Sequence, residues 1–132
     1  MLKLTYTETG FNLERLAQSP EQLVALRVIL AMRVGQTVCV EPSSAAFLLP
    51  VNLSALDLLE AEVWRDDGET IALCVADAEF VEVTLRGTWL SVDGEGADGL
   101  FVTRLSDRAE FLLVKLWVEA QGMVSFVKEV GD

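Results

Sequence analysis

The segment from Trp89 to Gly99 carries the densest group of residues in this sequence that could bind a ligand. It reads W-L-S-V-D-G-E-G-A-D-G, with the carboxylates of Asp93, Glu95 and Asp98 interspersed among three glycines. An EF-hand calcium loop needs oxygen ligands at fixed spacing and a distal glutamate, which this segment lacks. A phosphate cradle needs a cation, and three carboxylates without a lysine would repel the ligand. The segment is therefore predicted to be a hairpin loop between two strands, with a weak cation site as the alternative.

Histidine is absent from all 132 residues, which removes most nucleophilic and metal chemistry. Ser-His and Cys-His catalysis both need an imidazole, and so do nearly all histidine-containing zinc sites. Cys39 and Cys74 are too few to form a four-cysteine site. Ser43-Ser44 would need a lysine base, and none lies nearby in the sequence. No catalytic, metal-binding or cofactor-binding residue is assigned, and no cofactor is expected.

Paired carboxylates are the acid–base chemistry that the composition allows. Glu60 and Glu62 are expected to share one face of a strand, with Glu79 or Glu82 across from them. Hydrolysis of the glycosidase type needs two carboxyl groups facing each other in a cleft. Alternating acids on strands usually form a solvated sheet face, so a carboxylate-dependent hydrolase is the weakest hypothesis. Changing Glu62 or Glu82 to glutamine is expected to leave a non-catalytic function intact.

Hydrophobic residues make up 52 % of the chain, and the mean hydropathy is +0.38. The longest apolar stretch, residues 23–34, is interrupted by Arg27 and Arg33 and is too short for a bilayer span, which needs roughly twenty residues. A small soluble domain with so much apolar surface either has a very complete core or buries part of that surface against another chain. The second outcome predicts an oligomer, with a homodimer as the simplest form.

The net charge of −11, from 21 acidic and 10 basic residues, limits the possible partners. Such a surface repels nucleic acids and anionic membranes. The remaining partners are another protein, a second copy of the chain or a cation. The N-terminal residues lack the apolar core of a signal peptide, and Cys39 and Cys74 lie in apolar runs that predict buried, reduced thiols. A cytoplasmic location is expected.

The first third of the chain predicts a hairpin and a helix. Residues 2–7 and 11–16 alternate apolar and polar side chains on either side of Thr9-Gly10. Ser19-Pro20 then begins a helix that ends near Val34, before Gly35. This helix is apolar almost all round, which predicts that its own sheet and something else bury it on most sides. Its Arg27 and Arg33 are expected to pair with a carboxylate or a carbonyl or to reach outward, and a subunit interface is the sharper alternative.

The rest of the chain predicts further strands and a second long helix. The expected elements are strands at 37–41 and 46–49, one helical turn at 52–57 followed by a strand at 59–65, a hairpin turn at Asp67-Gly68, a buried central strand at 71–76, strands at 79–92 and 100–105 with a bulge at Gly87, a helix from Ser106 to Gly122, and a strand or docking tail at 123–130. The pattern Arg15-Leu16-x4-Glu21-x-Leu23 recurs from Arg104, through either duplication or similar capping chemistry.

The segments M-L-K-L-T-Y-T-E-T-G-F-N-L-E-R-L, A-L-R-V-I-L-A-M-R-V-G and L-R-G-T-W-L-S resemble a family of small cyanobacterial proteins of unknown function. The resemblance implies a bacterial cytoplasmic protein from a photosynthetic host and supplies no site residues. The predicted fold is a single α+β domain over residues 1–132, with a mostly antiparallel sheet and two main helices packed against it. The leading functional hypothesis is a non-catalytic interaction or regulatory module, expected to be a homodimer. A small apolar-ligand binder, with a pocket between the sheet and the 23–34 helix, is the main alternative.

Overall fold

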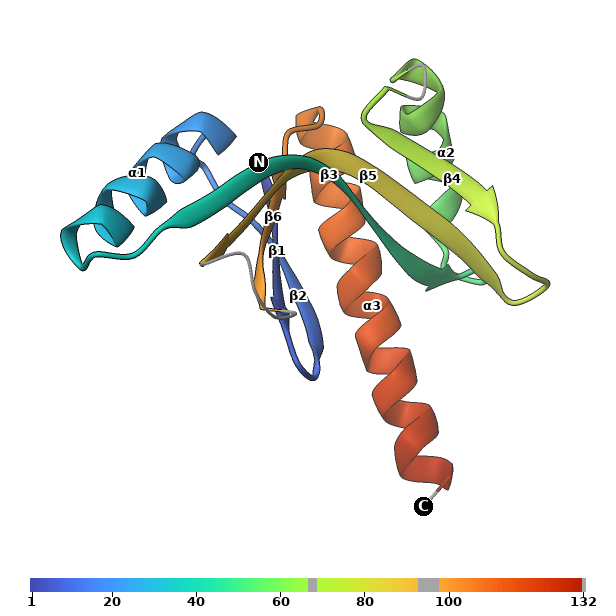
Figure 1. Ribbon diagram of the computed structural model, residues 1–132. Coiled ribbons are helices and arrows are strands. Elements are labelled where there is room, and N and C mark those ends of the chain that lie inside the picture. Colours follow the sequence, from blue (N-terminus) through green and yellow to red (C-terminus); the bar gives the residue numbers. More distant parts are fainter. Residues whose placement is uncertain (67–68, 93–97, 132) are drawn as a thin grey trace.

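A computed structural model describes residues 1–66, 69–92 and 98–131, with the backbone alone for residues 122–131. The chain forms one antiparallel sheet and three helices (Figure 1). The strand order is β2-β1-β6-β5-β3, and β4 also pairs with β5. In chain order the elements are β1 (Leu2–Thr7), β2 (Gly10–Arg15), α1 (Pro20–Arg33), β3 (Val38–Pro50), α2 (Leu56–Arg65), β4 (Ile71–Val75), β5 (Phe80–Val92), β6 (Gly99–Thr103) and α3 (Asp107–Gly131). The predicted α+β class with a mostly antiparallel sheet is confirmed.

One face of the sheet packs against α2 and α3 and forms the main core. Successive side chains of a strand point to opposite faces, so the core residues of each strand are drawn from one alternating set. The long helix α3 crosses the sheet, and its C-terminal part extends beyond the strands (Figure 1). The sheet contributes Leu2, Leu4, Leu13, Phe47, Leu49, Val83, Leu85 and Phe101, and the two helices contribute Leu56, Leu59, Leu112, Leu113 and Leu116.

Helix α1 lies on the opposite face, at one end of the sheet and away from α2 and α3 (Figure 1). Its start follows the sequence prediction: Ser19 and Gln22 form a capping box, and Pro20 occupies the first turn. Only Leu23 and Ala31 of α1 are buried. Leu23 belongs to a small second core cluster with Met1, Leu90 and Val102.

The remainder of that second face is exposed among the residues that the structure describes, and we call it the open face. It is formed by the alternate residues of β3, β4 and β5 that point away from the main core. Its exposed members are Ser44, Ala46, Leu48, Ala72, Cys74, Glu82 and Arg86. Helices α2 and α3 thus pack on one face of the sheet, and α1 packs on only part of the other face.

Gly87 marks the point where β5 changes partner. Residues up to Leu85 pair with β4, whereas pairing with β6 starts at Thr88. A β-carbon on Gly87 would lie 2.9 Å from both Phe101 Cζ and Thr103 Cβ and would collide with the Val102 carbonyl oxygen. The pairing of β5 with β3 continues through Gly87 without a break, so the predicted bulge is wrong. The glycine is needed for close approach of β6.

Two strand predictions in the middle of the chain are wrong. Residues 59–65 belong to α2, because Leu56, Leu59 and Glu62 repeat at helical spacing and all three are buried. The two short strands predicted at 37–41 and 46–49 are one strand, β3, which runs through Pro42. Its second edge has no partner strand among the described residues, and proline is tolerated at such an edge.

Two further predictions fail for related reasons. The apolar run at 71–76 is β4, which lies partly on the open face, so it is not a strand buried on both sides. The predicted helix end at Gly122 is also wrong, since α3 continues to Gly131 and replaces the strand or tail expected at 123–130. A glycine inside a helix costs only about 1 kcal/mol and need not end it. The predicted turn at Asp67-Gly68 lies outside the described residues.

Cys39 and Cys74 are both free and exposed, which corrects the prediction of buried thiols. Cys74 lies on the open face opposite Glu82. Cys39 lies near the start of β3, whereas the β3 residues in the main core begin at Ala45. In both cases a helix packs on the other face of the strand, and the face that carries the thiol is exposed.

A buried carboxylate ties the N-terminal strands to α3. The Oε1 atom of Glu110 accepts a hydrogen bond from Arg15 Nε at 3.0 Å and lies 3.3 Å from the Met1 ammonium group. Its Oε2 atom accepts a hydrogen bond from the Leu105 amide at 3.0 Å. The hydrogen bond to Glu110 is the main cause that raises the pKa of Arg15 above its ordinary value.

Candidate functional site

The acids considered for catalysis do not meet in a cleft. Glu62 is buried between α2 and α3, where its Oε1 lies 2.9 Å from Arg65 Nη1 and 3.2 Å from Arg108 Nε. Glu60 is exposed on α2, Glu79 is exposed before β5, and Glu82 lies on the open face. Glu62 therefore holds two helices together, and the facing pair that a hydrolase needs is not formed by these residues.

The acidic loop and the two serines add no catalytic geometry. Asp93 and Glu95 lie outside the described residues, while Asp98 is exposed just before β6. The flanking strands β5 and β6 are antiparallel neighbours, which confirms that the segment connects two paired strands. Ser43 and Ser44 lie on β3 opposite Gly87 and Arg86. No group of three or more potential ligands gathers among the residues that the structure describes.

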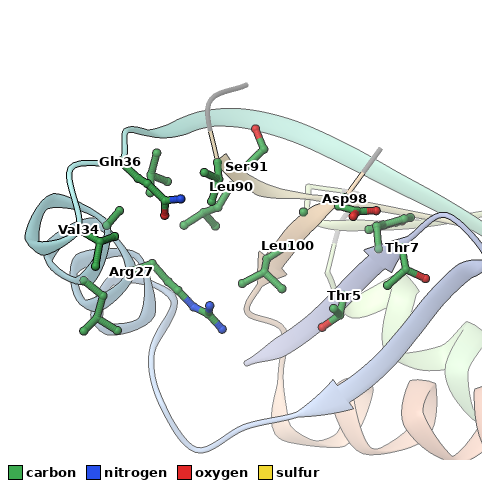
Figure 2. Close-up of a pocket in the computed structure, with 15 residues that line it drawn as sticks. Thr5, Thr7, Arg27, Val34, Gln36, Leu90, Ser91, Asp98 and Leu100 are labelled. Carbon is green, nitrogen blue, oxygen red and sulfur yellow. The ribbon is translucent and has the colours of Figure 1, made fainter. Parts of the chain in front are cut away.

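A groove of about 570 Å³ lies between α1 and the adjacent end of the sheet. Figure 2 shows its two walls, with Arg27 on α1 and the adjoining Val34 facing Leu90 and Leu100 on the strands. Its apolar lining consists mainly of Leu30, Val34, Val38, Leu90, Val92 and Leu100. The volume falls in the range of roughly 300–1,000 Å³ that is typical of small-molecule sites. A binder was expected to enclose a pocket between the sheet and this helix, whereas the space found at that position is an open groove.

Few polar groups line this groove, and they are unevenly placed. The Arg27 side chain extends from α1 toward Leu100 and Thr5, while Asp98 lies near Thr7 (Figure 2). Tyr6 also lines the groove, and burial raises the pKa of its phenol above the ordinary value. Arg27 is thus the cation of a largely apolar groove. The sequence singled out Arg27 but gave no partner for it.

The outer side of α1 is a second distinctive surface, which we call the α1 face. Its exposed apolar side chains are Leu26, Ile29, Leu30, Met32 and the adjoining Val34, each between 46 and 70 % exposed. The described residues of this chain do not bury α1 on most sides, and burial of α1 by a second molecule stays a prediction. Arg33 is exposed in the last turn of the helix, and Glu21 is exposed in the first turn.

The fold and these two surfaces define a class of protein: a small acidic α+β domain with an exposed apolar helix beside an open groove. The chain belongs to the Alr0857-like family, which it matches over residues 1–121. This confirms the resemblance to a cyanobacterial family. No curated protein and no solved structure matches the chain. No helix in the described parts of the chain is long and apolar enough to cross a membrane.

Proposed function

We propose that this protein is a non-catalytic, cytoplasmic interaction module that forms a homodimer through the α1 face. The carrying observation is the exposure of Leu26, Ile29 and Met32 on one side of a helix whose other side packs on the sheet. Burial of such an apolar surface against another surface stabilises the complex by about 25 cal/mol per Å² of apolar area removed from water.

Charge favours a second copy of the chain as the occupant. The protein has a net charge of −11, so two copies repel each other over most of their surfaces. Helix α1 differs, because residues 20–33 carry Arg27 and Arg33 against the single acid Glu21. Two copies can approach at this helix without placing many carboxylates together.

The distribution of charge along α1 favours an antiparallel pair of helices. Glu21 lies in the first turn and Arg33 in the last turn. In an antiparallel pair, the basic end of each helix lies beside the acidic end of the other, and the helix dipoles also oppose favourably. A two-fold axis perpendicular to α1 produces this arrangement and makes the interface self-complementary. Each charge pair contributes little, so the apolar side chains supply most of the affinity.

The size of the α1 face predicts a weak dimer. A helix of 14 residues is about 21 Å long and about 10 Å wide. The area of one side of such a helix is far less than the roughly 800 Å² that each partner buries in a standard interface. Val40 and Val92 are exposed on the same face of the sheet as α1 and can extend the contact. We therefore expect a dissociation constant in the micromolar range.

Sedimentation equilibrium over roughly 1–200 µM protein tests the proposal. The wild-type protein should change from monomer to dimer, whereas Ile29→Glu should stay monomeric because two buried carboxylates would face each other. Trp64→Glu is the matched control, since Trp64 is an exposed apolar residue on α2 and should not affect the dimer. A monomer at every concentration, or a dimer that Ile29→Glu leaves unchanged, would refute the proposal.

Binding of a small ligand is a second candidate function, favoured by the groove between α1 and the sheet. Its volume and its mostly apolar lining match those of ligand sites. The groove is lined by Leu30 and Ala31 of α1 and by the adjoining Val34, whereas Ile29 and Met32 belong to the α1 face alone. The two surfaces therefore share Leu30 and Val34, whereas Ile29→Glu changes the α1 face and Arg27→Gln changes the groove.

A further inference from the structure

We infer that the groove binds an amphipathic monocarboxylate, with its carboxylate on Arg27 and its aliphatic chain along the apolar walls. The inference rests on the second candidate function and adds the chemical class of the ligand. It depends on the position of one guanidinium group in a largely apolar groove.

Arg27 differs from the arginines that stabilise the fold. Arg15, Arg65 and Arg108 each have a carboxylate within 3.2 Å. Arg27 makes no ion pair with any carboxylate in the part of the chain that the structure describes, and its side chain extends into the groove (Figure 2). Arginine is well suited to a carboxylate because its planar guanidinium group can donate two parallel hydrogen bonds. An anionic head group would supply the partner.

The apolar walls of the groove determine the chemical character of the rest of the ligand. Leu30, Val34 and Val38 line one part, and Leu90, Val92 and Leu100 line another. An aliphatic chain buries against such surface with a gain of about 0.8 kcal/mol per methylene group. A purely polar anion would leave these side chains without a complementary surface, so the ligand must carry an apolar body.

Electrostatics select the charge and direction of the ligand. Asp98 lines the groove near Thr7, and in Figure 2 it lies apart from the Arg27 guanidinium group. Because Asp98 repels a carboxylate, the head group of the ligand binds beside Arg27 and not beside Asp98. The aliphatic chain of the ligand extends from Arg27 along the apolar walls of the groove. The net charge of −11 penalises each further negative charge, which favours a monoanion over a dianion.

Titration of the ¹⁵N-labelled full chain with octanoate, followed by NMR, tests this inference. Octanoate should shift the amides of Arg27, Ala31 and Leu100 in saturable fashion. Arg27→Gln should weaken octanoate binding at least about tenfold, while octanol binding should change little. Arg33→Gln is the matched control, because it removes the same charge from the same helix outside the groove lining. Raising the salt concentration should weaken octanoate binding alone.

The outcomes separate this inference from the function on which it rests. Octanoate and octanol could bind equally well, with no change in the Arg27→Gln variant. That result would support ligand binding by the groove but refute the inference that the ligand is a monocarboxylate. Saturable binding of octylammonium in place of octanoate would overturn it as well. Absence of binding by all three probes would overturn both the groove function and the monocarboxylate, and sedimentation of the dimer would be unaffected by that result.

Discussion

Replacement of Glu110 by glutamine should lower the free energy of unfolding by about 3 kcal/mol. The Glu110 side chain is only 2 % exposed, accepts hydrogen bonds from Arg15 and Leu105, and forms an ion pair with the Met1 ammonium group. An amide removes the negative charge and places an N–H group among these donors. The ammonium group of Met1 would then keep Leu16 O, at 2.8 Å, as its remaining hydrogen-bond acceptor.

The magnitude follows from the burial of each partner. Removing one member of a buried ion pair typically costs 3–5 kcal/mol. The lower end applies to Glu110, because Arg15 is 38 % exposed and retains Asp107 as a partner at 2.8 Å. For a chain of this size, about 3 kcal/mol lowers the melting temperature by roughly 10 °C.

Urea denaturation followed by tryptophan fluorescence measures the effect. Asp107→Asn is the matched control, because Asp107 is 98 % exposed and contacts the same arginine. Its loss should cost no more than about 1 kcal/mol, as expected for an exposed pair. A Glu110→Gln variant as stable as Asp107→Asn would refute the assignment of Glu110 as the link between β2 and α3.

Three further predictions follow from individual side chains. Gly87→Ala should cost about 2 kcal/mol in urea denaturation, because the new methyl group has no space beside β6; an unchanged midpoint would show that β6 can move away. Burial raises the pKa of Tyr6, so the stability it contributes is complete below pH 10 and is lost as the pH rises through the folded-state value. Titration of the phenolate absorbance reports Tyr6 alone, since the chain has one tyrosine, and a midpoint at 10.0 would contradict its burial. Cys39 and Cys74 should both react rapidly with a thiol reagent in the native protein. Slow reaction of either thiol would contradict the exposure of its side chain.

The sequence predicted the elements whose signals are local. The N-terminal hairpin and the start of α1 rest on turn and capping residues, and both are present as predicted. The sequence also predicted that α1 is apolar almost all round, and this includes its outer side. What the sequence could not show is that no other part of the described chain covers it. That depends on where α2 and α3 pack, and they pack on the other face of the sheet.

The incorrect predictions concern residues whose environment is set by distant parts of the chain. Glu62 belongs to an alternating pattern that favours a strand, yet Arg108 of α3 makes its burial in a helix possible. Cys74 lies in a run without polar residues, and its exposure follows from the open face. Neither the apolar content of a run nor its alternation reveals which face of a sheet is covered.

The groove could be predicted only in outline. A pocket between the sheet and the 23–34 helix was an alternative reading of the apolar composition, and the groove occupies that position. The role of Arg27 depends on its direction on α1, which places it on the groove side, whereas Arg33 is exposed and does not line the groove. Helical spacing alone leaves this choice open when almost every neighbouring residue is apolar.

Chemical cross-linking between copies is the measurement that most directly tests the α1 face as a homodimer interface. A chain with Cys39→Ser, Cys74→Ser and Ile29→Cys would be treated with a short bis-maleimide at a concentration that favours the dimer. Antiparallel pairing of α1 with its copy predicts an efficient covalent dimer. The control replaces Ile29→Cys by Val118→Cys, on the exposed side of α3, and should remain monomeric. Absence of a covalent dimer at position 29, or equal yields from both positions, would contradict the account.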